Sequence, residues 1–259
     1  LILENKVIQK NRMIKFYETE QMLRDGYALG EIDRIDDISD PKDISTWKNT
    51  QTSSSIEQSR FVGIFFNTSN EHFADKTLRQ AFAYAINKKE LGNARALSPI
   101  APTSWAYNPL VKPYDYDTAH AKELWGQIDA AGRPKSIQLV TIPSLLPAAE
   151  KIADDWRAAF GVEVVVQVSA GVPHDFQTLL ATLEIPPDPD QYGLWHSTQT
   201  ETNITRFSNA RIDKLLEDGR KQLDQNERKR IYLDFQRFLN EELPAIFLYH
   251  PERYSIKRK

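Results

Sequence analysis

The stretch ARIDKLLEDGRKQLDQNERKRIYLDFQRFLNEELPAIFLY, residues 210–249, predicts two helices followed by a strand. In its first part, apolar or small residues recur at the three- and four-residue spacing of a helix face that packs on a core. These residues are Ile212, Leu215, Leu216, Gly219 and Leu223. Charged residues occupy most positions between them, so we expect this helix to bury one face and to expose the other.

The second part begins at Asp224, which is placed to cap a helix, with Glu227 three residues later as in a capping box. A second apolar stripe follows, made of Ile231, Phe235, Phe238 and Leu239. Pro244 ends this helix, because a proline ring does not fit inside one. The apolar run over residues 246–249 then predicts a buried strand.

Strand-like and helix-like patterns alternate through the rest of the chain. Strands are expected over residues 13–17, 60–68, 137–142 and 162–168, and helices over 18–29, 145–160 and 173–182. Asp75 and Asp117 are placed to cap two further helices, and the proline-rich residues 97–116 predict an extended loop. This succession predicts the α/β class, with a mixed β-sheet flanked by helices.

The composition excludes several classes of function. The chain has 259 residues with 33 Lys and Arg against 36 Asp and Glu, so it carries no basic footprint for nucleic acid. It has no cysteine and no glycine-rich phosphate loop, so we expect neither thiol chemistry nor a nucleotide cofactor. The sequence contains no run of about 18 apolar residues, so we expect no membrane span. Because the chain starts at Leu1 and not at methionine, we expect it to be part of a longer protein.

Aromatic side chains in two loops are the main candidates for a binding surface. They are Trp105, Tyr107, Tyr192, Trp195 and His196, and none of them lies on a periodic apolar stripe. Such rings can stack on a solute and donate a hydrogen bond, although the sequence supports packing onto the core equally well. Asn67, Gln199, Asn203 and Arg206 could add polar contacts, and the guanidinium of Arg206 would suit a carboxylate.

Two Asp-x-Asp pairs, Asp115 with Asp117 and Asp188 with Asp190, could in principle hold a divalent ion. Aspartate beside proline is more often turn chemistry, and Asp117 already has a capping role. The histidines never lie within five residues of one another, which excludes a metal pair on one helix. We therefore expect no metal site, no cofactor and no catalytic residue. A metal-dependent transferase that uses Asp188 and Asp190 is kept as the alternative.

Several of these segments together resemble a known family. The family's most recognisable signature, an asparagine at a strand end followed by an R-Q-A helix, is similar to Phe66-Asn67-Thr68 followed by Leu78-Arg79-Gln80-Ala81. Its proline-rich loop is similar to the segment that contains Pro99, Pro102 and Trp105-Ala106-Tyr107. The run from Asp188-Pro189-Asp190 to Leu243-Pro244-Ala245 agrees as well. On these motifs, over residues 14–257, the chain resembles extracellular solute-binding proteins of peptide-type ABC importers, family five, which include oligopeptide, dipeptide and nickel binders.

The resemblance implies one lobe of a two-lobed, type II or cluster C, periplasmic-binding-protein-like fold. Residues 1–50 would belong to the first, cleft-proximal lobe and the crossover, residues 51–250 would form the C-terminal ligand-binding lobe, and residues 251–259 would return towards the first lobe. It also implies capture of a peptide or other small solute for a membrane ABC permease, in the periplasm or outside the cell, with lipoprotein anchoring as one form of attachment. We expect a monomer, and the remaining alternative is a protein-interaction module built on this fold.

The chain departs from the family's peptide binders at one place. Where the better-known members carry a tryptophan and, three residues later, an aspartate that grips the peptide's N-terminal ammonium, this chain carries Leu183-Glu184-Ile185-Pro186. Leu183 and Glu184 therefore join the candidate ligand-binding residues. The resemblance implies a solute other than a peptide with a free α-amino group, unless Glu184 replaces the missing carboxylate.

Overall fold

The computed structural model describes residues 13–259, which divide into two compact units. The smaller unit contains the described residues up to Ser55 together with Arg253–Lys259, and the larger unit is Ile56–Glu252. The chain passes from one unit to the other at the end of β2 (Thr50–Ile56) and returns at the start of β9 (Glu252–Arg258). The first twelve residues of the expected 1–50 segment lie outside the described part of the chain.

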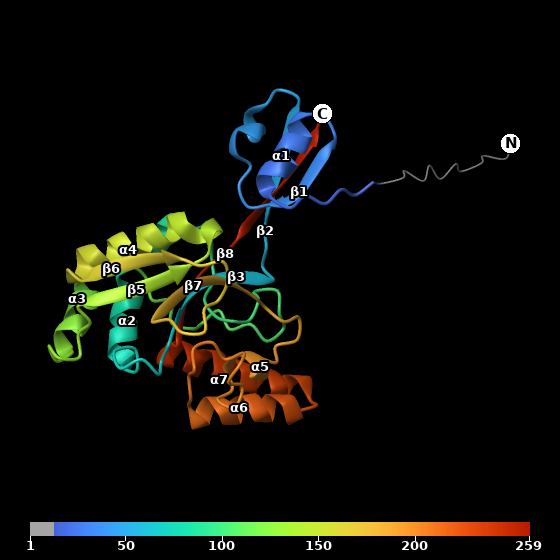
Figure 1. Cartoon of the computed structure of the whole chain (residues 1–259). Helices are drawn as coiled ribbons and strands as arrows, with labels where there is room; N and C mark the ends of the chain where they lie inside the picture. Colours follow the sequence, from blue (N-terminus) through green and yellow to red (C-terminus); the bar gives the residue numbers. More distant parts are fainter. Residues whose placement is uncertain (1–12) are drawn as a thin grey trace. The chain divides into compact units, whose positions relative to one another are not determined.

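The smaller unit contains a three-stranded sheet in the order β1-β9-β2, together with α1 (Glu20–Ala28), β1 (Arg34–Ile38) and the 3-10 helix η1 (Lys42–Thr46) (Figure 1). Thr19 caps α1 by accepting a hydrogen bond from Met22 N, as the helix predicted over 18–29 requires. The expected strand over 13–17 is wrong. Met13 and Phe16 are exposed there, because this apolar segment pairs with no strand in the described chain.

The larger unit contains a six-stranded sheet in the order β4-β8-β3-β7-β5-β6. β5 runs parallel to β6 and β7, whereas the pairs β3–β7, β3–β8 and β4–β8 are antiparallel, so the predicted mixed sheet is confirmed. The strands are β3 (Arg60–Phe66), β4 (Ala94–Arg95), β5 (Ser136–Thr141), β6 (Glu163–Val168), β7 (Thr178–Glu184) and β8 (Ala245–His250).

Helices cover both faces of this sheet (Figure 1). One face carries α2 (Lys76–Tyr84), α3 (Thr118–Gln127) and α4 (Leu146–Phe160), and the other carries α5 (Tyr192–Trp195), α6 (Ala210–Lys221) and α7 (Gln225–Glu242). The short 3-10 helices η2 (Lys88–Glu90) and η3 (Pro143–Leu145) precede β4 and α4. Alternate residues of β3 enter the two cores, Ile64 and Phe66 on one face and Phe61 and Phe65 on the other, as the two-residue period of a strand requires.

The structure confirms the three predicted helix caps. Asp75, Asp117 and Asp224 each accept backbone N–H bonds at the start of α2, α3 and α7. The capping box at α7 is only half formed, because the Glu227 carboxylate pairs with Arg230 at 2.7 Å. Leu223, expected on the buried face of the first helix, is 95% exposed in the turn after α6.

The helix expected over residues 173–182 is wrong. Thr178–Glu184 forms β7, which lies between β3 and β5 and pairs with both. A short continuous apolar run such as TLLATL fits a buried helix or a central strand equally well by pattern. The two neighbouring strands decide the outcome, because they satisfy the backbone of β7 on both edges.

Candidate functional site

The two loops that carry the candidate aromatic residues both pack on the face of the sheet that α6 and α7 cover. The loop over residues 97–116 is irregular, as predicted, and it is fastened to α7. Asn108 Nδ2 donates to Leu233 O at 3.0 Å, and Gln236 Nε2 donates to Ala106 O at 2.8 Å. Trp105 and Tyr107 are half-buried against this core, and burial raises the pKa of the Tyr107 hydroxyl.

The Asp-Pro-Asp segment in the second loop is a turn tied to both helices. Asp188 Oδ1 accepts from Asp190 N at 2.9 Å, and Asp190 Oδ1 accepts from Tyr192 N at 2.9 Å. The Asp188 carboxylate also receives both terminal nitrogens of Arg228, at 2.9 and 2.6 Å. These bonds hold the pKa of Asp188 below its usual range. Asp190 Oδ2 lies 2.9 Å from Arg220 Nε.

This geometry gives no support to the transferase alternative. The carboxylates of Asp188 and Asp190, which that alternative needs as metal ligands, already bind arginines. Within residues 13–259, no group of three or more His, Asp or Glu side chains is arranged to hold a metal ion.

Trp195 and His196 lie inside the protein and not on its surface. Trp195 is 2% exposed, its ring packs near Phe65 and Phe247, and its Nε1 donates to Gln191 Oε1 at 3.2 Å. The Trp195 side chain is thus part of the core on the α6–α7 face of the sheet. His196 is also buried, and its Nδ1 accepts from Thr198 N at 3.2 Å.

Tyr192 is half-buried, and its ring stacks on His196 with centroids 4.1 Å apart. The guanidinium of Arg220 covers the Tyr192 ring at 4.5 Å. Gln199 is half-buried nearby, with Nε2 donating to Thr198 Oγ1 at 3.3 Å. Of Tyr192, Trp195, His196 and Gln199, the half-buried Tyr192 and Gln199 are thus the ones with surface left for a solute.

Asn67 and Arg206 lie together at the end of β3, around the segment 174–176. The buried Asn67 donates from Nδ2 to Phe176 O at 2.9 Å and accepts from Ser69 N at 3.1 Å, so its amide is used within the protein. Arg206 Nη2 donates to His174 O at 2.7 Å, and its Nη1 lies 3.6 Å from Asp175 Oδ1. Arg206 remains exposed, and its backbone has a positive φ of 53°.

Leu183 and Glu184 lie at the end of β7. Leu183 is half-buried against the α6–α7 side of the sheet, whereas Glu184 is exposed and accepts from Arg60 Nη2 at 2.8 Å. The structure therefore does not bring all candidates into one cluster. The aromatic and leucine side chains share one core, while Asn67 and Arg206 surround the 174–176 segment. The ion-pair partners Arg60, Arg220 and Arg228 carried no sequence signal, because each is far along the chain from its carboxylate.

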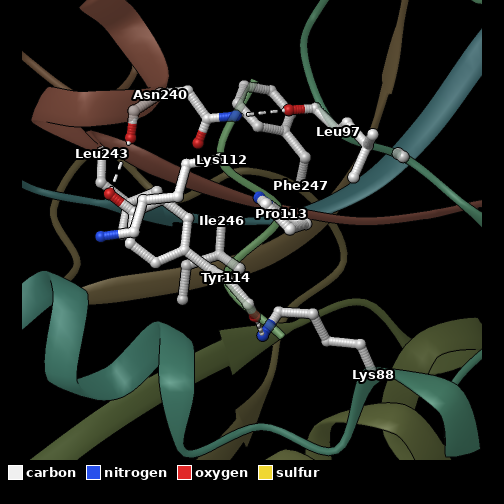
Figure 2. Close-up of a pocket in the computed structure, with 10 residues that line it drawn as sticks. Lys88, Leu97, Lys112, Pro113, Tyr114, Asn240, Leu243, Ile246 and Phe247 are labelled. Carbon is white, nitrogen blue, oxygen red and sulfur yellow. Dashed lines mark hydrogen bonds between the residues drawn. The ribbon is translucent and has the colours of Figure 1, made fainter. Parts of the chain in front are cut away.

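A small pocket lies on the larger unit, beside β8 and the end of α7 (Figure 2). Lys88, Lys112, Tyr114, Asn240 and Phe247 are among its lining residues, and Tyr114 donates from its hydroxyl to Asn240 O at 3.1 Å. The space holds about one water molecule. It contains none of the predicted binding residues and is too small for a peptide or a comparable solute.

Comparison with known families now defines the class of protein. Residues 13–203 match the bacterial extracellular solute-binding proteins, family 5, in the part called the middle region. This chain belongs to that family, whose members are solute-binding proteins and not enzymes. None of the helices described for residues 13–259 has the length and apolar character of a membrane span.

Curated relatives are similar over most of this chain but extend well beyond it. The oligopeptide-binding protein AppA of Bacillus subtilis is 27% identical over 232 residues, which cover 75% of this chain and 42% of that protein. The heme-binding protein A of Haemophilus influenzae is 27% identical over 216 residues, covering 72% of this chain and 38% of that protein. The chain thus spans about two-fifths of the length of these relatives.

A solved structure shows the fold. The oligopeptide-binding protein AppA from Bacillus subtilis, in complex with a nonapeptide, superposes with a TM-score of 0.81 at 22% identity, over 92% of this chain and 54% of that chain. The architecture is therefore part of the two-lobed periplasmic-binding-protein fold.

Proposed function

We propose that this chain is the C-terminal lobe of the solute-binding component of an ABC importer, and that it captures a small solute outside the membrane for delivery to a permease. The family match over residues 13–203 is the observation that carries this proposal. In such an assembly residues 51–250 form the solute-binding lobe, residues 1–50 belong to the other lobe and the crossover, and residues 251–259 return to it. Hinge closure of two lobes on the solute then presents one closed shape to the permease.

The solute is a peptide or another small molecule held by the loops described above. Two relatives that are each 27% identical to this chain are named oligopeptide-binding and heme-binding. Proteins this similar to the chain therefore bind very different solutes. Glu184 is already paired with Arg60, whose positive charge weakens the attraction of this carboxylate for a solute ammonium. This favours a solute without a free α-amino group.

The surface for the solute is proposed to include Trp105, Tyr107, Leu183, Tyr192, Gln199 and Arg206. Asn67, Trp195 and His196 contribute by holding these loops in place, since their side chains are buried. Glu184 contributes through its pair with Arg60. The chain works as a monomer, in the periplasm or at the outer surface of the cell membrane.

The test is native mass spectrometry of the intact two-lobe parent purified from its own host. A small molecule that travels with the protein is the expected result, and its mass identifies the cargo class. The isolated 259-residue chain should fold but bind that molecule at least about a hundredfold more weakly, because half of the contacts that bury the solute are missing. Equal affinity of the fragment, or a parent whose only stable partner is another protein, would contradict the proposal.

A further inference from the structure

Arg228, in the first turn of α7, has all of its guanidinium nitrogens engaged. Nη1 and Nη2 donate to the two carboxylate oxygens of Asp188 at 2.9 and 2.6 Å. Nε donates to Gly219 O on α6 at 2.9 Å, and Nη2 lies 3.4 Å from the hydroxyl of Tyr232. Such a bidentate pair fixes geometry as well as energy, because the planar fork matches the carboxylate.

The same guanidinium also contacts the loop that carries Trp105. Its central carbon lies 5.7 Å from the centroid of the Trp105 ring and 5.3 Å from that of Tyr232. Both distances lie within the range of a cation–π contact. One side chain therefore touches the loop over residues 97–116, the Asp-Pro-Asp turn and both helices.

We propose that Arg228 is a positioning residue that couples the Trp105 loop to the Asp-Pro-Asp turn, so that the two candidate binding loops are ordered as one unit. Naming them binding loops rests on the proposed function, whereas the coupling itself rests on the contacts of Arg228. In the importer, such coupling would let a solute that touches one loop order the other before the lobes close.

The neighbouring ion pair provides a matched control within the same turn. Asp190 binds Arg220, whose guanidinium covers Tyr192 in the second loop. Among the described residues, the cation–π contact of Arg220 is with Tyr192, whereas that of Arg228 includes Trp105. Loss of the Asp190–Arg220 pair should therefore loosen only the loop that contains Asp190 and Tyr192. Loss of the Asp188–Arg228 pair should also loosen the loop that contains Trp105.

Hydrogen exchange of the 259-residue chain, followed by mass spectrometry, tests this without any solute. The amides of Tyr107 and Asn108 report on the Trp105 loop, because they donate to Ser104 O and Gln236 Oε1. Asp188→Asn should accelerate their exchange on the order of tenfold, the equivalent of a charge-assisted bond worth about 1.4 kcal/mol. Asp190→Asn should leave their exchange unchanged, and β5 should stay protected in both variants.

Arg228→Lys, which keeps the charge but loses the fork, should accelerate exchange in both loops with β5 still protected. Wild-type exchange at residues 104–108 in Asp188→Asn would overturn the proposal, as would an equal acceleration in Asp190→Asn. Because the readout needs no solute, a parent that carries no small molecule would refute the proposed function and leave this result standing.

Discussion

The guanidinium of Arg60 on β3 binds the carboxylate of Glu184 on β7, with Nη2 and Nε at 2.8 and 3.2 Å from the same oxygen. The two residues are directly opposite in the antiparallel register of these strands. Cross-strand pairs of opposite charge stabilise a sheet, but solvent screens an exposed pair. Glu184 lies where this chain departs from the family's peptide binders, and its carboxylate forms an ion pair at the end of the strand.

Glu184→Gln should lower the free energy of unfolding by less than about 1 kcal/mol, because Glu184 is exposed and the pair is screened by water. Urea unfolding at low and high salt measures this, and the small difference should shrink as salt rises. In the parent protein the same variant should leave the affinity for its solute nearly unchanged. A large loss of affinity would mean that Glu184 binds a cationic group of the solute directly.

Arg79→Met should be among the most destabilising single changes, lowering the free energy of unfolding by about 3 kcal/mol or more. The Arg79 side chain is 2% exposed and donates to four carbonyl oxygens, those of Phe73, Ala74, Glu242 and Leu243. Methionine would leave these acceptors buried without donors. Lys122→Met, at an exposed position of α3, is the matched control and should change stability by less than about 0.5 kcal/mol. Similar effects of the two variants in urea unfolding would contradict this account.

Substitution by alanine should have opposite effects on stability at two helical glycines, Gly219 and Gly126. Gly219→Ala in α6 would place a Cβ 2.8 Å from Cζ of the buried Tyr232, so the packing of α6 on α7 must shift and stability should fall by about 1–3 kcal/mol. Gly126→Ala in α3 meets nothing within 4 Å. It should raise stability by about 0.5–1 kcal/mol through the better helix propensity of alanine. Thermal unfolding of both variants checks the signs, and a stabilising Gly219→Ala would refute the close contact.

Lys88 should make stability depend on pH above neutrality. The residue is 3% exposed, its ammonium donates to Tyr114 O at 2.6 Å and to Ala83 O, and burial lowers its pKa to about 7. Between pH 7 and about 10.4, the unfolded chain therefore holds a proton that the folded chain has released, so stability rises with pH. Below pH 7 Lys88 is protonated in both the folded and the unfolded state. The folded state then bears the full free-energy cost of the buried charge.

The measurement is the difference in unfolding free energy between the wild type and Lys88→Met at pH 7.5, 8.25 and 9. It should grow by up to about 1.4 kcal/mol per pH unit, because one proton separates the two states. Other titrating groups cancel in this difference. A difference that stays flat would show that the surrounding carbonyls keep Lys88 protonated in the folded protein.

Much of the secondary structure could be predicted because its signals are local. Asp75, Asp117 and Asp224 cap helices through bonds to amides two or three residues away, and the apolar faces of α6 and α7 follow from spacing alone. Leu223 was placed wrongly, because α6 ends at Lys221, before the apolar pattern does. The segments 13–17 and 173–182 failed because the presence of neighbouring strands, which no local pattern records, decides whether an apolar run becomes a strand.

The sequence by itself determined the α/β class, the mixed sheet between helices, the capped helices and the family motifs, since these depend on residue type and spacing along the chain. Only the tertiary structure decided that Trp195 belongs to the core and that the Asn67 amide forms hydrogen bonds within the protein at a strand end. It also decided that Asp188 and Asp190 bind arginines. The physical reason is distance along the chain. Arg228 lies 40 residues from Asp188, and a carboxylate becomes a loop anchor only when folding brings its partner within hydrogen-bonding reach.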